Sequence, residues 1–208
     1  MYGDDKEASI GASVALQVEK EMKFVQDVDV NERAEKILKE IIAVCDRQDL
    51  VYTIHVIDED TKNAFSLPGG YVYIYKGLLD LMDKNKDDQL ASVIAHEVSH
   101  IVAKHAMKRL QGAYGAMVLE GLAIASGNTA VAAGIDLTAS SLLLKNSRED
   151  EFEADHLGIK YMRLVGYDPA QMKIMLSKLV EAQAKEPPRP PFSRAERNFP
   201  ELYQCLTM

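Results

Sequence analysis

The sequence predicts an α+β domain that is mostly helical and contains a small mixed or antiparallel sheet. Apolar residues recur with helical spacing along most of the chain, whereas only two short segments are rich in β-branched and aromatic residues. These two segments lie together between helical regions, which favours an α+β fold over alternating βαβ units. The length of 208 residues, 47% of them hydrophobic, suits one domain with a sizeable core. We expect a single domain over 1–208, with N-terminal helices (1–48), a core (49–166) and C-terminal helices with a proline-rich loop (167–208).

Two helices are expected in the N-terminal part. Asn31 is a suitable N-cap for the second helix, because its side chain can accept a hydrogen bond from the first turn. Apolar residues of this helix recur at i, i+1, i+4, i+5 and i+8, which places them on one face. They are Ile37, Leu38, Ile41, Ile42 and Cys45.

Two strands are expected next. The run VYTIHVID, residues 51–58, is β-branched and reads as a strand. The run YVYIY, residues 71–75, follows the turn signal Pro68-Gly69-Gly70 and reads as a second strand.

The sequence pattern becomes helical from residue 87 onward. Asp87 or Asp88 can cap the first helix of this region. The apolar positions of that helix are Leu90, Ile94, Val98, Ile101 and Val102.

Two later helices have clear start signals. Ser147 and Asp150 resemble a capping box at the start of a helix that runs to about Leu164. Asp168 followed by Pro169 is typical of another helix start. The proline-rich run EPPRPPFSR that follows cannot continue a helix.

Charge and hydropathy limit the classes of partner. The chain has 32 acidic and 24 basic side chains and a net charge of −8, which argues against a nucleic-acid-binding protein. The apolar stretch 113–144 contains an uncharged run of only residues 121–135, and a membrane-spanning helix needs about 20 apolar residues. No signal peptide is visible at the N-terminus. Cys45 and Cys205 could form a disulfide in an oxidising compartment or remain buried thiols.

His96-Glu97-Val98-Ser99-His100 forms an HExxH motif inside a strongly helical segment. Residues at i and i+4 share a helix face, so both imidazoles can bind one ion. A catalytic zinc ion keeps three protein ligands and a water, and Glu97 can act as the general base on that zinc-bound water. The alternative, two histidines at the core edge with a surface glutamate between them, would need partners to offset desolvation.

The best candidate for the third ligand is Glu151 in the run SREDEFEAD. Glu151 and Asp155 lie at i and i+4 on one helix face. Glu151 can therefore coordinate zinc while Asp155 accepts a hydrogen bond from the outer nitrogen of a ligand histidine. Glu149 and Glu153 are expected to be solvated residues of a helix start.

The other histidines are expected to be ordinary residues. A metzincin would carry glycine at position 103 and histidine at 106, and alanine occupies both. His105 lies about 140° of helical rotation from His100, which would point it away from the ion. His55 and His156 belong to no ligand spacing that we recognise.

The motifs HEVSH and SREDEFEAD-HLG, with the stretch NAFSLPGGYVYIYKGLL (63–79), resemble gluzincin peptidases of the CAAX prenyl protease and HtpX type, in their soluble, exported branch. The resemblance covers roughly 7–166, and a weaker similarity lies near Arg197. It implies a zincin-like fold with the HExxH helix beside an edge strand, a catalytic core over 49–166 and one Zn²⁺ per chain.

The same resemblance implies a role for each matching residue. His96, His100 and Glu151 would be the zinc ligands, and Glu97 the catalytic carboxylate. Asn63 would contact the bound substrate, although asparagine at this position is equally suited to a turn. Arg197 is a second candidate substrate contact.

The chain departs from the family pattern downstream. The family usually carries Thr-His-Pro with an arginine six residues after the histidine, whereas Pro191 lies six residues before Arg197 and no histidine follows His156. Either another donor such as Arg197 or Arg194 takes this role, or a loop is missing. Loss of one oxyanion donor costs about 10²–10³ in rate.

The predicted function is a zinc endopeptidase that acts on extended or unfolded polypeptides. Two alternatives remain: a zinc-binding, chaperone-like module with little turnover, and a membrane-anchored peptidase that uses 113–144 as a re-entrant element. The expected partner is a polypeptide substrate, with no nucleic acid and no membrane span, although the protein could act near a membrane. A periplasmic or otherwise exported location follows from the resemblance alone.

Overall fold

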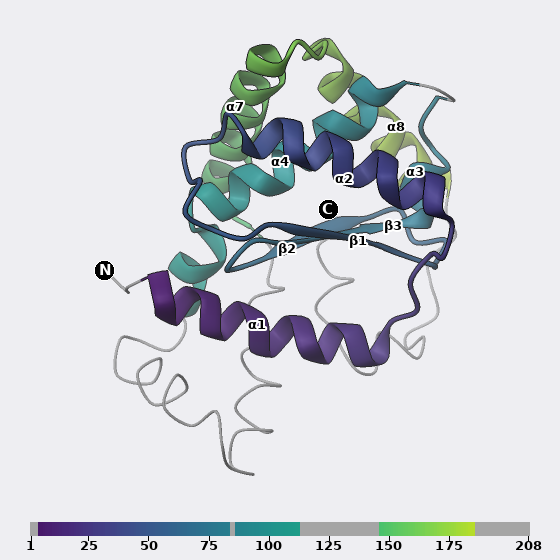
Figure 1. The fold of residues 1–208 in the computed structure, drawn as a ribbon. Helices are drawn as coiled ribbons and strands as arrows, with labels where there is room; N and C mark the ends of the chain where they lie inside the picture. Colours follow the sequence, from purple (N-terminus) through teal and green to yellow (C-terminus); the bar gives the residue numbers. More distant parts are fainter. Residues whose placement is uncertain (1–3, 84–85, 113–145, 186–208) are drawn as a thin grey trace.

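A three-stranded mixed sheet forms the middle layer of the molecule, with helix α1 (Asp4–Glu21) on one face and helices α2 (Val28–Ile42) and α4 (Asp87–Val102) on the other (Figure 1). This computed structural model describes residues 4–83, 86–112 and 146–185. The prediction of a mostly helical α+β fold with a small mixed sheet is confirmed.

The sheet consists of β1 (Thr53–Ile57), β2 (Ala64–Leu67) and β3 (Tyr71–Tyr75), in the spatial order β1-β3-β2. Strand β1 is parallel to β3, whereas β2 is antiparallel to β3 and occupies one edge. Gly69 and Gly70, at φ 83° and 108°, make the turn between β2 and β3 with a backbone that other residues rarely adopt. Both strands expected from the β-branched runs are present, and β2 is the strand that the residue pattern did not predict.

Four further elements complete the described fold. They are α3 (Lys76–Leu79), a helical segment over 105–112, α7 (Arg148–Val165) and α8 (Ala170–Lys185). In the part of the chain that the structure describes, no helix has both the length and the apolar character needed to cross a membrane. The stretch 113–144 and the proline-rich run lie outside the described residues, as does Cys205, so its pairing with Cys45 stays open.

The start of α7 confirms the predicted capping box. The Ser147 hydroxyl accepts a hydrogen bond from the Asp150 amide, and the Asp150 carboxylate accepts one from the Ser147 amide, both at 3.1 Å. The helix ends at Gly166, whose φ of 90° is left-handed. This reciprocal cap sets the first turn of the helix that carries Glu151.

The predicted N-cap of α2 is wrong. Asp27 caps this helix, and its carboxylate accepts hydrogen bonds from the amides of Asp29 and Val30. Asn31 lies inside the helix, and its side-chain amide donates to the carbonyl of Val25. A carboxylate at the N-cap also interacts favourably with the positive end of the helix dipole, which explains why the acid takes this position.

The predicted cap of α4 is also displaced. Lys86 is the N-cap residue and makes no side-chain cap, whereas Asp87 and Asp88 lie in the first turn. Both acids are used in tertiary contacts instead: Asp87 accepts from Arg33 at 2.7 Å, and Asp88 accepts from the Asp168 amide at 2.7 Å.

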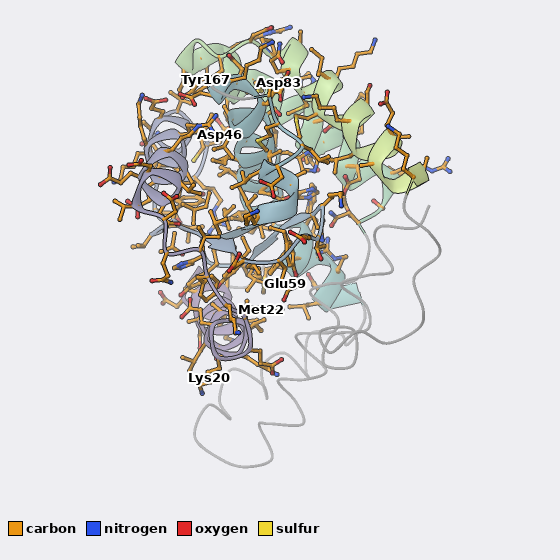
Figure 2. The ribbon with its side chains drawn as sticks, turned by 90° about the vertical axis from the view of Figure 1, so that its right-hand side faces the viewer. Lys20, Met22, Asp46, Glu59, Asp83 and Tyr167 are labelled. Atoms are coloured by element: carbon orange, nitrogen blue, oxygen red, sulfur yellow. The ribbon has the colours of Figure 1, made fainter. Side chains whose placement is uncertain are left out.

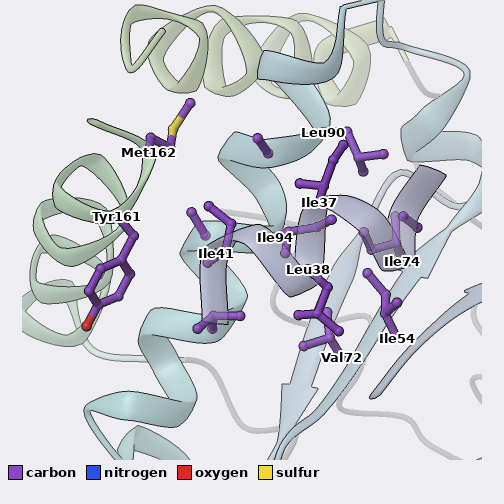
Figure 3. Packing of buried hydrophobic residues seen from close by; sticks show 14 of the residues in the cluster. Ile37, Leu38, Ile41, Ile54, Val72, Ile74, Leu90, Ile94, Tyr161 and Met162 are labelled. Carbon is purple, nitrogen blue, oxygen red and sulfur yellow. The ribbon is translucent and has the colours of Figure 1, made fainter. Parts of the chain in front are cut away.

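Two hydrophobic clusters hold the layers together. The larger one joins one face of the sheet to α2, α4 and α7, and Figure 3 shows Ile41, Ile94, Val72 and Tyr161 contributing from these four elements. Burial of one such aliphatic side chain contributes about 1.5–3 kcal/mol, so this cluster firmly positions α4. The smaller cluster joins α1 to the opposite face of the sheet. Its members include Ile10, Val14, Val18, Phe65, Tyr73 and Tyr75.

Figure 2 shows the two sides of the sheet from another direction. In Figure 2, Lys20 of α1 and Met22, just after this helix, lie at one end of the molecule, and Asp83 and Tyr167 lie at the other. The sheet is therefore enclosed between α1 and the helical layer that contains α2 and the HExxH helix α4.

Helix α4 ends abruptly after Val102. Among the described residues other than glycine, Lys104 alone has a positive φ, 56°, and the chain resumes as a helix at residue 105 in a new direction. A left-handed residue breaks the regular rotation of 100° per residue. The assumption that His105 continues the geometry of α4 is therefore wrong, whereas His105 is not among the grouped candidate ligands of the described residues, as predicted.

Candidate metal centre

Helices α4 and α7 pack against each other and bring three potential metal ligands together. The Nε2 atoms of His96 and His100 lie 3.0 Å apart. Oε2 of Glu151 lies 3.5 Å from Nε2 of His96, and Oε1 lies 3.5 Å from Nε2 of His100. The capping box at Ser147 sets the helical turn from which Glu151 projects, so local sequence and packing together create this arrangement.

The separations of these atoms fit one tetrahedral zinc ion. Two ligand atoms at about 2.0–2.1 Å from such an ion are about 3.3–3.4 Å apart, close to the three distances observed. Two imidazole nitrogens and a carboxylate oxygen are also a common donor set of catalytic zinc. The residues present therefore fit a zinc ion in both spacing and chemistry.

The electrostatics of this group favour a cation. Burial lowers the pKa of His96, but hydrogen bonds with Asp155 and Glu151 outweigh burial and raise that pKa to about 10. Burial raises the pKa of Glu151, yet its hydrogen bond with His96 and the charge of that imidazole lower it to about 2. Burial and the neighbouring His96 lower the pKa of His100, which keeps this imidazole neutral and able to coordinate.

Asp155 lies where the sequence predicted it, behind a histidine of the motif. Its Oδ1 is 2.9 Å from Nδ1 of His96. With Nδ1 engaged by a carboxylate, Nε2 is the nitrogen that faces His100 and Glu151. A carboxylate in this position sets the tautomer and the ring orientation of the imidazole.

His105 makes the equivalent contact to the second histidine, which the sequence argument missed. Nδ1 of His105 lies 2.8 Å from Nδ1 of His100, and Nε2 of His105 lies 3.1 Å from Oε2 of Glu153. The expectation that Glu153 is only a solvated residue is therefore wrong as well. His55 and His156 take no part in the group of ligands.

Glu97 lies on the same helix and is almost fully buried, with 8% of its surface exposed. Its Oε2 accepts a hydrogen bond of 2.9 Å from Oγ of Ser66, in the edge strand β2. Burial raises the pKa of Glu97, whereas the neighbouring His96 and the Ser66 hydrogen bond lower it. A carboxylate with a raised pKa is suited to exchange a proton near neutral pH. Ser66 gave no sequence signal, because a serine within a strand is ordinary.

Asn146 is a further residue that the sequence argument missed. Its side-chain amide donates to Oε1 of Glu151 at 2.6 Å and lies 3.3 Å from Nε2 of His100. Arg109 donates in turn to the side-chain oxygen of Asn146. These contacts connect the segment 105–112 to the start of α7 and restrict the position of the Glu151 carboxylate.

Asn63 and Arg197 are the two residues predicted to contact the substrate. Asn63 directly precedes β2, and its carbonyl accepts a hydrogen bond of 3.0 Å from the amide of Tyr75, which extends the pairing of β2 with β3. Arg197, like Arg194, lies outside the described residues. Both substrate contacts therefore stay predictions.

Comparison with known proteins identifies the family. The sequence model of peptidase family M48 matches residues 29–204, a range that contains every residue discussed above as a candidate ligand. The chain belongs to peptidase family M48. The prediction of a metallopeptidase family is confirmed at this level, whereas the narrower CAAX prenyl protease and HtpX branch stays a prediction.

Several curated proteins are similar to this M48 chain. Mitochondrial metalloendopeptidase OMA1 of Schizosaccharomyces pombe is 35% identical over 150 residues, which cover 72% of this chain and 44% of that protein. OMA1 of Arabidopsis thaliana is 31% identical over 165 residues, covering 77% and 32%. The beta-barrel assembly-enhancing protease of Escherichia coli K12 is 33% identical over 149 residues, covering 65% and 29%. This chain therefore spans less than half the length of each of these relatives.

Proposed function

We propose that this protein is a zinc-dependent endopeptidase that hydrolyses peptide bonds of extended or unfolded polypeptides. The observation that carries the proposal is the convergence of His96 Nε2, His100 Nε2 and the Glu151 carboxylate beside the buried carboxylate of Glu97. Membership of family M48 and the protease names of its relatives support the same reaction class.

In this proposal His96, His100 and Glu151 hold one zinc ion. When bound, zinc supplies Lewis acidity, lowering the pKa of water towards about 7 and polarising a carbonyl group. Glu97 accepts the proton of the attacking water and later delivers it to the leaving amine. Ser66 holds the Glu97 carboxylate in place for both transfers through its hydrogen bond of 2.9 Å.

The edge strand supports an extended substrate. Strand β2 pairs with β3 on one side only within the described sheet, and Ser66 of β2 contacts Glu97. An extended peptide can add to such an edge through backbone hydrogen bonds, with little demand on its side chains. Asn63, which directly precedes β2, is the residue that we propose to contact the substrate chain there.

The decisive experiment compares the wild type with Glu97→Gln. Zinc content and cleavage of casein, an unstructured protein, are measured for both proteins. We expect the variant to keep one zinc per chain and to lose cleavage, because glutamine cannot take up the proton. The control is Glu149→Gln, an exposed residue of α7 with the same change of charge. Undiminished cleavage by Glu97→Gln would rule out the proposed role.

The same measurements test the alternative, a zinc-binding chaperone-like module. The absence of any histidine after His156 is the observation that favours this alternative. One zinc per wild-type chain, without hydrolysis of any member of a peptide library, would support it over the peptidase. An exported location, predicted from the resemblance, is best tested by fractionating cells that express the natural protein.

A further inference from the structure

We propose that His105 is a positioning residue that orients His100 towards the metal, as the middle member of a relay from His100 through His105 to Glu153. This inference rests on the proposed function, because it assumes that His100 binds zinc. The proposal is based on the contacts of both ring nitrogens of His105. Nδ1 lies 2.8 Å from Nδ1 of His100, and Nε2 lies 3.1 Å from Oε2 of Glu153.

The order of protons along the relay follows from the atoms that face each other. Nε2 of His100 faces the other ligands, so its Nδ1 carries the hydrogen and donates to Nδ1 of His105. Nε2 of His105 must then carry its own hydrogen, and it faces Oε2 of Glu153 and, at 3.4 Å, Oδ1 of Asp150. In this arrangement each of the two imidazoles has one donor and one acceptor nitrogen, and every donor meets an acceptor.

The two motif histidines are therefore held by matching contacts. His96 donates from Nδ1 directly to the carboxylate of Asp155 at 2.9 Å. His100 reaches a carboxylate by the same nitrogen, but through the interposed ring of His105. Such contacts set tautomer and orientation and raise the basicity of a ligand imidazole.

The surroundings of His105 hold its ring in one position. Its side chain is fully buried, and a buried imidazole without partners would be costly. The left-handed Lys104 turns the chain at the end of α4 and thereby returns His105 towards His100. Lys104 itself lies 3.3 Å from the buried carboxylate of Glu7, which ties this turn to α1.

The test is the zinc dissociation constant, measured by chelator competition, together with the thermal unfolding of the metal-free protein. His105→Phe keeps the ring volume but removes both nitrogens, and we expect zinc binding to weaken about 10–100-fold. His156→Phe, an exposed residue of α7, is the control and should bind zinc like the wild type. In His105→Gly, added imidazole should restore part of the lost affinity, which a purely space-filling role does not predict.

Glu153→Gln tests the far end of the relay at an exposed site, where misfolding is not a concern. We expect a loss near the lower end of that range, because Asp150 still offers an acceptor. Glu149→Gln on the same helix is the matched control. If His105→Phe does not fold, the zinc dissociation constants of Glu153→Gln and Glu149→Gln decide whether the relay contributes to zinc binding.

The outcomes separate the two proposals. Wild-type zinc affinity in both His105→Phe and Glu153→Gln would overturn the relay while leaving the peptidase intact. A wild-type protein that binds no zinc would instead overturn the proposed function itself.

Discussion

Ser66 Oγ lies 2.9 Å from Oε2 of Glu97 and donates a hydrogen bond to it, so the edge strand of the sheet directly contacts the carboxylate of the HExxH motif. This contact joins the strand that we propose to receive the substrate to the group that we propose to move the proton. Substrate binding and proton transfer would then share one rigid unit.

Ser66→Ala removes this contact without removing the carboxylate. A hydrogen bond to a charged group is worth about 1.5–3 kcal/mol, so kcat should fall by about tenfold or more. KM and zinc content should change little. The control is Ser92→Ala, because Ser92 donates its hydrogen bond within α4, to the carbonyl of Gln89. Equal losses in the two variants would indicate general damage to α4.

Asp155→Ala should weaken zinc binding by about 10–100-fold, because Nδ1 of His96 loses its acceptor at 2.9 Å. Asp155→Asn should lose less, since the amide oxygen can still accept from Nδ1. Chelator competition distinguishes the two variants. The same affinity for Asp155→Ala as for the wild type would contradict the role assigned to this carboxylate.

Glu7→Gln should lower the free energy of unfolding substantially. Glu7 is buried in α1 and pairs with Arg47 at 2.9 Å and with Lys104 at 3.3 Å. Breaking a buried ion pair from one side costs about 3–5 kcal/mol, because the remaining charge stays buried. Urea unfolding measures the change. Glu35→Gln in the exposed pair with Lys39 should cost less than about 1 kcal/mol.

Gly11→Ala should destabilise the contact between α1 and the turn that follows β2. A Cβ atom at residue 11 would lie 1.8 Å from the carbonyl oxygen of Pro68, so the helix would have to move. Overpacking of this kind typically costs about 1–3 kcal/mol. Gly112→Ala is the matched control, because no described residue lies within 4 Å of its added Cβ and alanine favours a helix. Thermal unfolding of both variants provides the comparison.

Asp46→Asn should reduce stability only slightly, with the full effect above about pH 4 and a smaller effect below it. Hydrogen bonds from Lys160 and Tyr161 lower the pKa of Asp46 below its ordinary value of 3.8. A carboxyl group with a lowered pKa stabilises the fold above its unfolded pKa, and this contribution disappears as the pH falls through its folded pKa. The pair is half exposed, so the difference at pH 7 should be under about 1 kcal/mol. A difference that grows at acidic pH would contradict this explanation.

The features that the sequence predicted well are those that depend on neighbours along the chain. His96 and His100 share a helix face because the helix repeats every 3.6 residues, and no tertiary contact is needed for that. The capping box at Ser147 is likewise a matter of three consecutive peptide units. The strand over 71–75 follows from five aromatic or β-branched residues, which suit a pleated backbone.

The misplaced helix starts show where local reasoning is less exact. Asp27, Asn31 and the acids near residue 87 are all good capping residues, and sequence preference alone ranks them too closely to choose. In the structure Asp27 caps α2, while the acids near residue 87 are drawn into contacts with Arg33 and Asp168.

By itself, the sequence determined the nature of the protein: an α+β chain whose HExxH helix and downstream acidic helix together indicate a metallopeptidase. Only the tertiary structure decided how the site is supported. Ser66, Asn146 and the relay through His105 come from segments whose approach depends on the packing of β2, α4 and α7. The turn at Lys104 illustrates why the sequence did not predict these contacts. A single left-handed residue, which is neither glycine nor proline, directs His105 towards His100.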